Sequence, residues 1–169
     1  YAELLAEIAV RKRAEVVIQT RLRLMQYSNT HTLDELLQTT IDEIEALTDS
    51  QIGFFHFLQA DQKTLELQCW STNTLQNMCT AQGKGSHYDV DQAGVWADCV
   101  RQQKPIIHND YAALQNRSGL PEGHATILRE LAVPIMRDEK IVAILGVGNK
   151  PQDYTSIDIE LVSTLIDFA

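Results

Sequence analysis

Cysteine is scarce in this chain, and its few copies form no pattern that binds metal or builds disulfides. The 169 residues contain three cysteines, Cys69, Cys79 and Cys99, which lie ten and twenty positions apart. An odd count without a Cys-x-x-Cys pair argues against a disulfide framework and against a structural zinc site. We therefore expect reduced thiols, a cytoplasmic protein and no metal ligands.

The chain also lacks a surplus of basic residues and any long hydrophobic run. Fourteen Lys and Arg stand against 23 Asp and Glu, which gives a net charge of −9 with neutral His. Such a charge repels phosphate groups, so we expect no nucleic-acid partner and no direct contact with a membrane. No apolar run approaches the roughly 18 residues of a membrane span, and the charged N-terminal stretch is unlike a signal peptide. One acidic globular domain is the prediction.

The first 27 or so residues contain neither Gly nor Pro and predict a single helix. Steps of four and three residues along it select seven positions, which we call the seam: Leu4, Ile8, Arg11, Glu15, Ile18, Leu22 and Met25. A 3.5-residue repeat aligns such positions on one side of a helix, as in a dimeric coiled coil. The alternative is a helix packed on its own domain, which a period of 3.6 also allows. We treat residues 1–28 as a linker helix.

Capping boxes, in which a Thr is followed three residues later by an acidic residue, predict the start of two further helices. Thr32 with Glu35 opens one helix, and Thr155 with Asp158 opens the other. Their apolar residues recur at helical spacing and predict buried stripes. The stripes are Leu33, Leu36, Leu37, Ile41, Ile44 and Leu47 in the first, and Ile157, Leu161, Leu165 and Phe168 in the second.

Between these helices the pattern predicts strands joined by tight turns. Residues 51–58 and 64–71 predict an antiparallel pair, with Leu65, Leu67 and Cys69 on one face.

The second half of the chain predicts a helix over 93–103, a brief strand at 106–108 and a short helix capped by Asp110. Two apolar runs, 131–136 and 141–147, flank a charged tetrapeptide and predict a hairpin. Strands joined in this way favour an α+β fold with an antiparallel sheet.

The order of these elements and several local motifs resemble a GAF domain. Gly53–Leu58 is similar to the first core strand of the family, and Lys104–Asp110 to its segment of a proline, hydrophobic residues and Asp. Glu130–Ile135 and Ile141–Lys150 resemble its terminal hairpin, and Tyr154–Leu161 resembles the start of its final helix.

The resemblance covers residues 32–169 and implies a PAS-related antiparallel sheet of five or six strands, flanked by helices, with long N- and C-terminal signalling helices. Glu7–Glu15 resembles the connector that leaves a PAS domain in bacterial sensors. Together the two resemblances imply a multidomain sensor such as a histidine kinase or a diguanylate cyclase, dimeric through its terminal helices. Because the last helix is still amphipathic at Ala169, we expect the chain to continue into an output domain.

GAF domains commonly bind a small molecule between the sheet and the helices and loops that cover it. By this resemblance, the ligand-binding candidates are Trp70, Tyr88, Trp96, His108, Tyr111 and His124, which combine apolar bodies with polar tips. An alternative interpretation makes the tryptophans core residues and the histidines ordinary satisfied or exposed side chains. In the sensory hypothesis, occupancy changes the packing of the 115–124 loop and thereby the terminal helices.

No particular cofactor is implied. Bilin-binding relatives use a cysteine that is often followed by His, whereas Trp70, Thr80 and Val100 follow the cysteines here, which argues against a covalent bilin. Haem needs an axial His, and the five histidines leave haem open without supporting it. Cyclic-nucleotide-binding relatives carry Asn-Lys…Phe-x-x-x-Asp-Glu, which this chain matches in part and which we expect to tie the last hairpin to the last helix. The corresponding residues are Asn149, Lys150, Tyr154, Asp158 and Ile159.

Two alternatives to a ligand sensor stay open. One is a ligand-free structural module that only spaces and dimerises its neighbours. The other is an enzyme, because one branch of the family reduces free methionine sulfoxide with cysteine thiols. Those reductases carry Gly-Val-Cys, where this chain has Gly94-Val95-Trp96, and a second cysteine where residues 123–126 read Gly-His-Ala-Thr. No other catalytic motif is present, so we expect no enzymatic activity in this segment.

Overall fold

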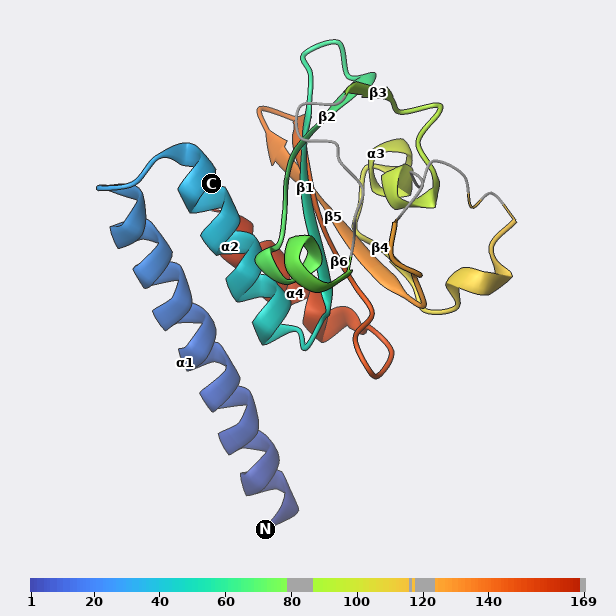
Figure 1. Cartoon of the computed structure of the whole chain (residues 1–169). Coiled ribbons are helices and arrows are strands. Elements are labelled where there is room, and N and C mark those ends of the chain that lie inside the picture. Colours follow the sequence, from blue (N-terminus) through green and yellow to red (C-terminus); the bar gives the residue numbers. More distant parts are fainter. Residues whose placement is uncertain (79–86, 116, 118–123, 168–169) are drawn as a thin grey trace.

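A six-stranded antiparallel sheet forms the centre of the protein. The computed structural model describes residues 1–78, 87–115, 117 and 124–167. The strands follow the order β3-β2-β1-β6-β5-β4, and all neighbours are antiparallel (Figure 1). They are β1 (Ile52–Leu58), β2 (Thr64–Trp70), β3 (His87–Asp89), β4 (Ile106–His108), β5 (Glu130–Arg137) and β6 (Lys140–Gly148). The expected α+β fold with an antiparallel sheet of five or six strands is confirmed.

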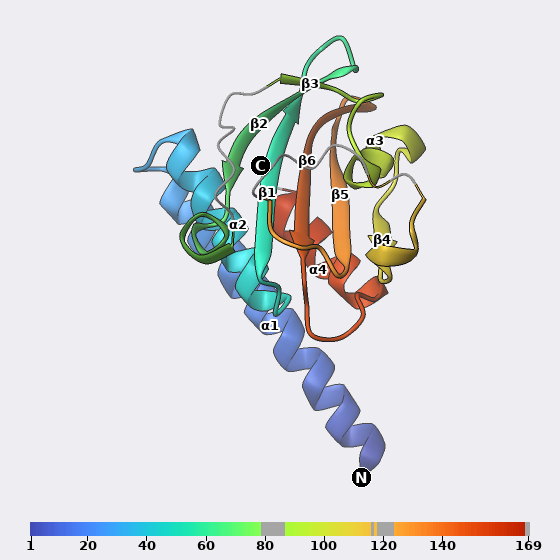
Figure 2. The same cartoon turned by 45° about the vertical axis from the view of Figure 1, so that its right-hand side comes forward.

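Helices cover the two faces of the sheet unequally. Two helices, α2 (Leu33–Leu47) and α4 (Ser156–Ile166), lie against one face, which we call the first face, and α1 (Ala2–Ser28) packs on these two helices (Figures 1 and 2). Short segments lie on the second face or at its edges: the π-helix η1 (Thr74–Met78), the 3₁₀ turns η2 (Val95–Ala97) and η3 (Tyr111–Ala113), and α3 (Asp98–Gln102). Each face has its own buried apolar cluster.

Both predicted capping boxes are present and fix where α2 and α4 begin. The Thr32 backbone N–H donates to Glu35 Oε2 at 2.8 Å, and the Thr155 N–H donates to Asp158 Oδ2 at 2.9 Å. Most of the predicted stripes are buried against the first face, but Leu33 and Ile157 are exposed. Leu33 lies in the first turn of α2, before its first buried residue, and Ile157 faces a groove toward α1. Phe168 lies outside the described residues.

The prediction that Leu65, Leu67 and Cys69 share one face is wrong, because β2 contains a β-bulge. Phe55 pairs with Cys69, whereas the next residue of β1 pairs with Leu67, so Gln68 is an extra residue. An extra residue shifts the alternation of side chains by one position. Leu65 and Leu67 therefore pack into the second-face cluster, and Cys69 packs beside the first-face cluster.

The helix predicted over 93–103 is shorter than expected. Gly94 has an extended backbone, η2 follows it, and only Asp98–Gln102 forms an α-helix. Gln103 then takes a left-handed conformation, with φ of 54°, and ends α3.

α1 buries side chains against its own domain in its C-terminal half. Its buried residues are Val17, Thr20 and Leu24, and Arg23 forms an ion pair with Glu43 of α2 at 3.1 Å. The N-terminal half extends past the edge of the domain, and residues 1–16 are all exposed (Figures 1 and 2). All seven seam positions are exposed, so the domain does not pack on the seam.

Candidate ligand-binding site on the second face

Aromatic rings gather on the second face from four separate parts of the chain. The Phe54 ring on β1 makes edge contacts with Trp70 of β2 and Trp96 of η2, with centroids 6.4 and 5.7 Å away. His56 lies 4.6 Å from Trp96, and His124 meets Trp70 edge-on at 5.4 Å. Edge contacts of this kind hold the rings in defined orientations. The result is an aromatic cluster buried between the sheet and η2.

A glycine provides the space for this cluster. Gly146 of β6 lies opposite Phe54 of β1, and a Cβ atom at position 146 would come within 2.0 Å of the Phe54 ring. Phe54 therefore lies across the neighbouring strand at a place where only glycine fits.

His56 is the most deeply buried histidine of the cluster. Burial lowers the pKa of His56 to about 3, so the imidazole is neutral at physiological pH. A neutral imidazole is both a donor and an acceptor, and it has an unprotonated nitrogen.

Next to the aromatic cluster, charged side chains meet around His108 of β4. Its Nδ1 contacts Glu130 Oε1 at 2.9 Å, and its Nε2 lies 3.5 Å from Asp98 Oδ2. The bond to Glu130 raises the pKa of His108, and burial raises the pKa of Glu130 although His108 opposes this. Arg101 holds Asp98 from the other side at 2.6 Å. The cluster joins α3, β4 and β5 on one side of the second face.

Among the residues that the structure describes, two buried donors at this site have no hydrogen-bond partner. The Trp70 Nε1 and Tyr111 Oη atoms are both shielded from solvent and unpaired. Burial raises the pKa of Tyr111 to about 12, with Glu130 as a further cause, so the hydroxyl stays protonated. An unsatisfied buried donor costs about 1–3 kcal/mol, which a ligand with acceptor atoms would recover.

The His108 cluster predicts a pH-dependent stability. Because folding raises the pKa of His108, its contribution is complete below its unfolded pKa and is lost as the pH rises through the folded value. Folding also raises the pKa of Glu130, so the contribution of this carboxyl group to stability falls as the pH rises as well, over a lower pH range. The lowered pKa of the buried His56 acts with the opposite sign, so the test is the variant: relative to the unchanged protein, His108→Gln should lose more urea resistance at about pH 6 than at about pH 8.5, which alters the difference in stability between the two pH values. An unchanged difference in His108→Gln would contradict the assignment.

Five of the six predicted ligand-binding residues come together on this face. Trp70, Trp96 and His124 lie in the aromatic cluster, and His108 and Tyr111 lie beside it at Glu130. The sixth, Tyr88, is in β3 opposite Leu65, and its side chain lies outside the described part of the structure.

Sequence reasoning missed Phe54, His56, Asp98, Glu130 and Gly146. The alternation of residues 54, 56 and 58 in β1 was a usable signal, because period two places them on one face.

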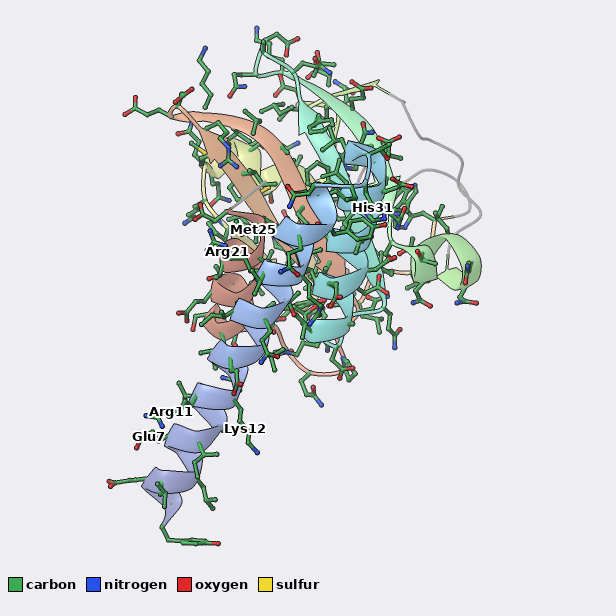
Figure 3. The ribbon with its side chains drawn as sticks, turned by 90° about the vertical axis from the view of Figure 1, so that its left-hand side faces the viewer. Glu7, Arg11, Lys12, Arg21, Met25 and His31 are labelled. Carbon is green, nitrogen blue, oxygen red and sulfur yellow. The ribbon has the colours of Figure 1, made fainter. Side chains whose placement is uncertain are left out.

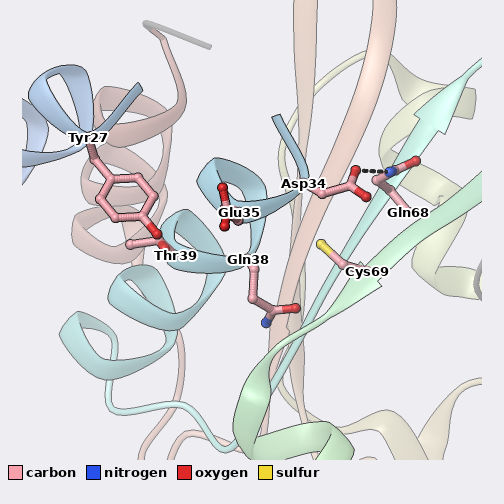
Figure 4. A pocket seen from close by; sticks show the side chains of 7 residues that line it. All are labelled: Tyr27, Asp34, Glu35, Gln38, Thr39, Gln68 and Cys69. Carbon is pink, nitrogen blue, oxygen red and sulfur yellow. Dashed lines mark hydrogen bonds between the residues drawn. The ribbon is translucent and has the colours of Figure 1, made fainter. Parts of the chain in front are cut away.

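One surface cavity adjoins the site at Asp98, and its lining does not include the aromatic rings. A cavity of about 680 Å³ adjoins Asp98, and it is lined by Asp91, Ala93, Gly94, Val95, Asp98, Arg101, Gln115 and Arg117. A separate pocket of about 290 Å³ lies on the other side of the sheet, between α2, β2 and Tyr27 (Figure 4). Both carboxylates of this pocket already accept hydrogen bonds within the protein. Asp34 accepts from the Gln68 side chain at 2.8 Å, and Glu35 accepts from the Thr32 N–H in the capping box of α2. The second face is therefore the better candidate.

The predicted role of the partial Asn-Lys…Asp motif is confirmed. Asn149 Oδ1 accepts from the Leu128 N–H at 2.7 Å, and its Nδ2 donates to the Thr126 carbonyl at 2.8 Å. Lys150 forms an ion pair with Asp158 of the α4 cap at 2.7 Å. The motif thus connects the segment after His124 to the start of α4.

This architecture, one antiparallel sheet with long helices on one side and short covering segments on the other, defines the class of the protein as an α+β domain. Residues 30–169 match the profile of the GAF domain family, and the chain belongs to that family.

A curated relative is the methyl sulfide methyltransferase-associated sensor of Methanosarcina acetivorans. It is 33% identical over 168 residues, which cover 95% of this chain and 17% of that protein. The chain thus spans about a sixth of the length of that sensor. The structure also resembles the GAF domain of an Acinetobacter phosphoenolpyruvate-protein phosphotransferase, with a TM-score of 0.71 and 18% identity over 89% of this chain and 88% of that one.

A third similar structure is that of free methionine-R-sulfoxide reductase from Neisseria meningitidis. Its TM-score is 0.66 at 14% identity, over 90% of this chain and 85% of that one, and at this identity the likeness concerns the fold alone. In the present chain Cys99 is buried, and burial raises the pKa of its thiol to about 12, which opposes thiolate chemistry. Cys79 and most of the 115–124 loop lie outside the described residues.

Within the described residues, no helix is long and apolar enough to cross a membrane. The same residues contain no group of three or more His, Cys, Asp or Glu side chains arranged to hold a metal ion.

Proposed function

We propose that the second face binds a small organic molecule and that this domain senses it. The observation that carries the proposal is a pair of buried donors, Trp70 Nε1 in the aromatic cluster and Tyr111 Oη, which have no partner in the described part of the chain. Rings supply a flat apolar surface, and the unpaired donors supply the few polar contacts that orient a ligand. GAF membership and a sensor among the relatives favour this role.

Two residues that are adjacent in the chain, Asn149 and Lys150, would carry the signal from the site to α4. Asn149 holds residues 126–128, and the next residue, Lys150, holds the cap of α4. A ligand that moves the segment after His124 therefore acts on α4, which packs against α1. A ligand shifts such an equilibrium only by its difference in affinity for the two states.

We further propose a wider context for the domain. It would form a homodimer through its terminal helices in a cytoplasmic signalling protein, with a PAS domain upstream and an output domain downstream. A histidine kinase or a diguanylate cyclase would be a fitting parent. The rival function is a ligand-free relay, in which side chains fill the second face completely.

Native mass spectrometry of the purified protein, compared with the mass of the denatured chain, tests the proposal. A releasable extra mass supports the sensor and identifies the class of ligand. Bare protein that also fails to gain mass from a metabolite extract supports the relay and overturns ligand binding.

Tyr111→Phe separates a ligand contact from a structural role. Because the hydroxyl is buried and unpaired, its removal should leave the free energy of unfolding unchanged or slightly raised. The affinity for the bound molecule should fall about tenfold, which is the value of one lost hydrogen bond. Urea unfolding and the fraction of protein that carries the extra mass are the two measurements. Equal retention of that mass by the variant would exclude Tyr111 from the site.

A further inference from the structure

Side chains of α2 hold the end of β2, at the point where the chain leaves the sheet. Within the described ranges β3 pairs only with Thr64–Glu66, so the last residues of β2 have a strand partner in β1 alone. We call residues 70–74, where β2 ends and η1 begins, the corner. Three polar residues of α2, Gln38, Asp42 and Glu45, reach the corner. Their spacing of four and three residues places them in one row along the helix, which we call the polar row.

The first two members of the polar row bind the backbone of the corner. Gln38 Nε2 donates to the Trp70 carbonyl oxygen at 2.8 Å, and Figure 4 shows the Gln38 side chain between α2 and β2. Asp42 accepts from Thr72 twice, with Oδ1 from the backbone N–H and with Oδ2 from the hydroxyl, both at 2.7 Å. Hydrogen bonds to an ionised carboxylate are stronger than neutral ones. The backbone on both sides of residue 71 is therefore fixed to α2.

The third member of the polar row extends this network into the interior. Glu45 accepts from the Ser71 hydroxyl, and the Ser71 oxygen lies 2.7 Å from Thr74 Oγ1. Thr74 Oγ1 also accepts from the Gly53 N–H of β1 at 3.0 Å. Ser71, Thr74 and Glu45 are all buried. Breaking any one of these bonds leaves a buried polar group without a partner, so the corner and α2 move together.

Trp70 belongs both to this network and to the second face. Its carbonyl is held by α2, whereas its ring lies in the aromatic cluster, edge-on to His124 and to Phe54. Its Nε1 has no hydrogen-bond partner in the described part of the chain. The direction of this N–H follows from the backbone to which the ring is attached, and α2 holds that backbone.

We propose that Gln38 and Asp42 are positioning residues of the ligand site. They fix the backbone of the corner, and with it the direction in which the Trp70 N–H meets a ligand. The inference rests on the proposed function and adds a second connection from the site, to α2. Coupling between two places in a protein is reciprocal. A ligand that displaces Trp70 therefore acts on α2, and a change in α2 alters the ligand's affinity.

The connection continues from α2 into α1. The two helices follow each other in the chain, and the short turn between them carries His31, which Figure 3 shows near the upper end of α1. Arg23 of α1 also forms an ion pair with Glu43 of α2 at 3.1 Å. A shift of α2 therefore reaches the helix that projects from the domain.

Fluorine NMR of protein labelled with 5-fluorotryptophan tests the positioning. The chain has two tryptophans, Trp70 and Trp96, and Trp96→Phe assigns their two resonances. Gln38→Met and Asp42→Ala should shift the Trp70 resonance and leave that of Trp96 in place. Asp42→Asn keeps an acceptor for the Thr72 N–H and should return the Trp70 resonance toward its original position.

Glu43→Ala is the matched control for Asp42→Ala. It also removes a carboxylate of α2 that is engaged in the folded protein, but this carboxylate binds Arg23 and not the corner. It should leave the Trp70 resonance in place, and urea unfolding of each variant separates lost stability from changed position. An unmoved Trp70 resonance in Gln38→Met, or an equal shift in Glu43→Ala, would overturn the proposal.

Hydrogen exchange tests the coupling in the other direction. Trp70→Phe should increase amide exchange in α2 more than in α4, because the altered ring changes the corner that α2 holds. Trp96→Phe makes the same change in the same aromatic cluster, at a residue of η2, and should leave exchange in α2 unchanged. Equal exchange of α2 in the two variants would contradict the coupling. Both experiments use the protein without added ligand, so their outcome is separate from the mass-spectrometric test of ligand binding.

Discussion

Replacing Gly146 with alanine is expected to lower the free energy of unfolding by about 3 kcal/mol. The added Cβ would come within 2.0 Å of the Phe54 ring, and this ring is held by Trp70, Trp96 and His56. Neither β6 nor the ring can move without disturbing the sheet or the aromatic cluster. Urea unfolding measures the loss, and near-ultraviolet circular dichroism measures the disturbed tryptophans.

Gly148→Ala is the matched control, because Gly148 lies on the same face of the same strand. Its added Cβ would meet the Arg129 carbonyl oxygen at 3.3 Å, which is tight but not a clash. We expect a loss below about 1 kcal/mol. Adding Phe54→Leu to Gly146→Ala should cost less than the sum of the two single changes, because the smaller side chain makes room. Equal losses in the two glycine variants would show that the Phe54 ring is not the reason for Gly146.

Substituting Ile18 and Leu22 with glutamate should dissociate the proposed dimer, raising its dissociation constant at least about a hundredfold. Each copy would lose two apolar seam contacts and bring like charges together at the interface. The monomer should keep its stability, because both side chains are mostly exposed, at 66% and 54%. Analytical ultracentrifugation measures the dissociation, and urea unfolding measures the stability.

The control replaces Val10 and Val16 with glutamate, which changes the same number of exposed apolar residues off the seam. It should leave the dimer intact. Binding at the second face should persist in both variants, because the site lies across the sheet from α1. A dimer that survives the Ile18 and Leu22 substitutions would remove the seam from the interface.

The local features of the fold could be derived from neighbouring residues alone. Thr32 with Glu35 and Thr155 with Asp158 close capping boxes within four residues of chain. The predicted hairpin turns through Asp138 and Glu139, whose φ values of 48° and 62° match the right-handed twist of the strands. The length of α1 followed from an uninterrupted run without Gly or Pro. Such features depend on short-range hydrogen bonds and backbone geometry, which the residue types specify.

The site itself was only partly accessible from sequence. The candidates Trp70, Trp96, His108, Tyr111 and His124 were chosen because they combine apolar bodies with polar tips, and they lie on one face. Their partners Phe54 and Glu130 were missed, because those residues read as ordinary strand positions.

What the sequence determined by itself was the set of elements, their order and hence the family, together with the row of seam residues on α1. The tertiary structure decided which face each side chain reaches. The bulge at Gln68 sends Cys69 to the first face and Trp70 to the second, although period two alone predicts the reverse. It also decided that His56 is buried and neutral, and that the seam is left open. These properties depend on contacts between distant segments, and the periodicity of one segment does not contain them.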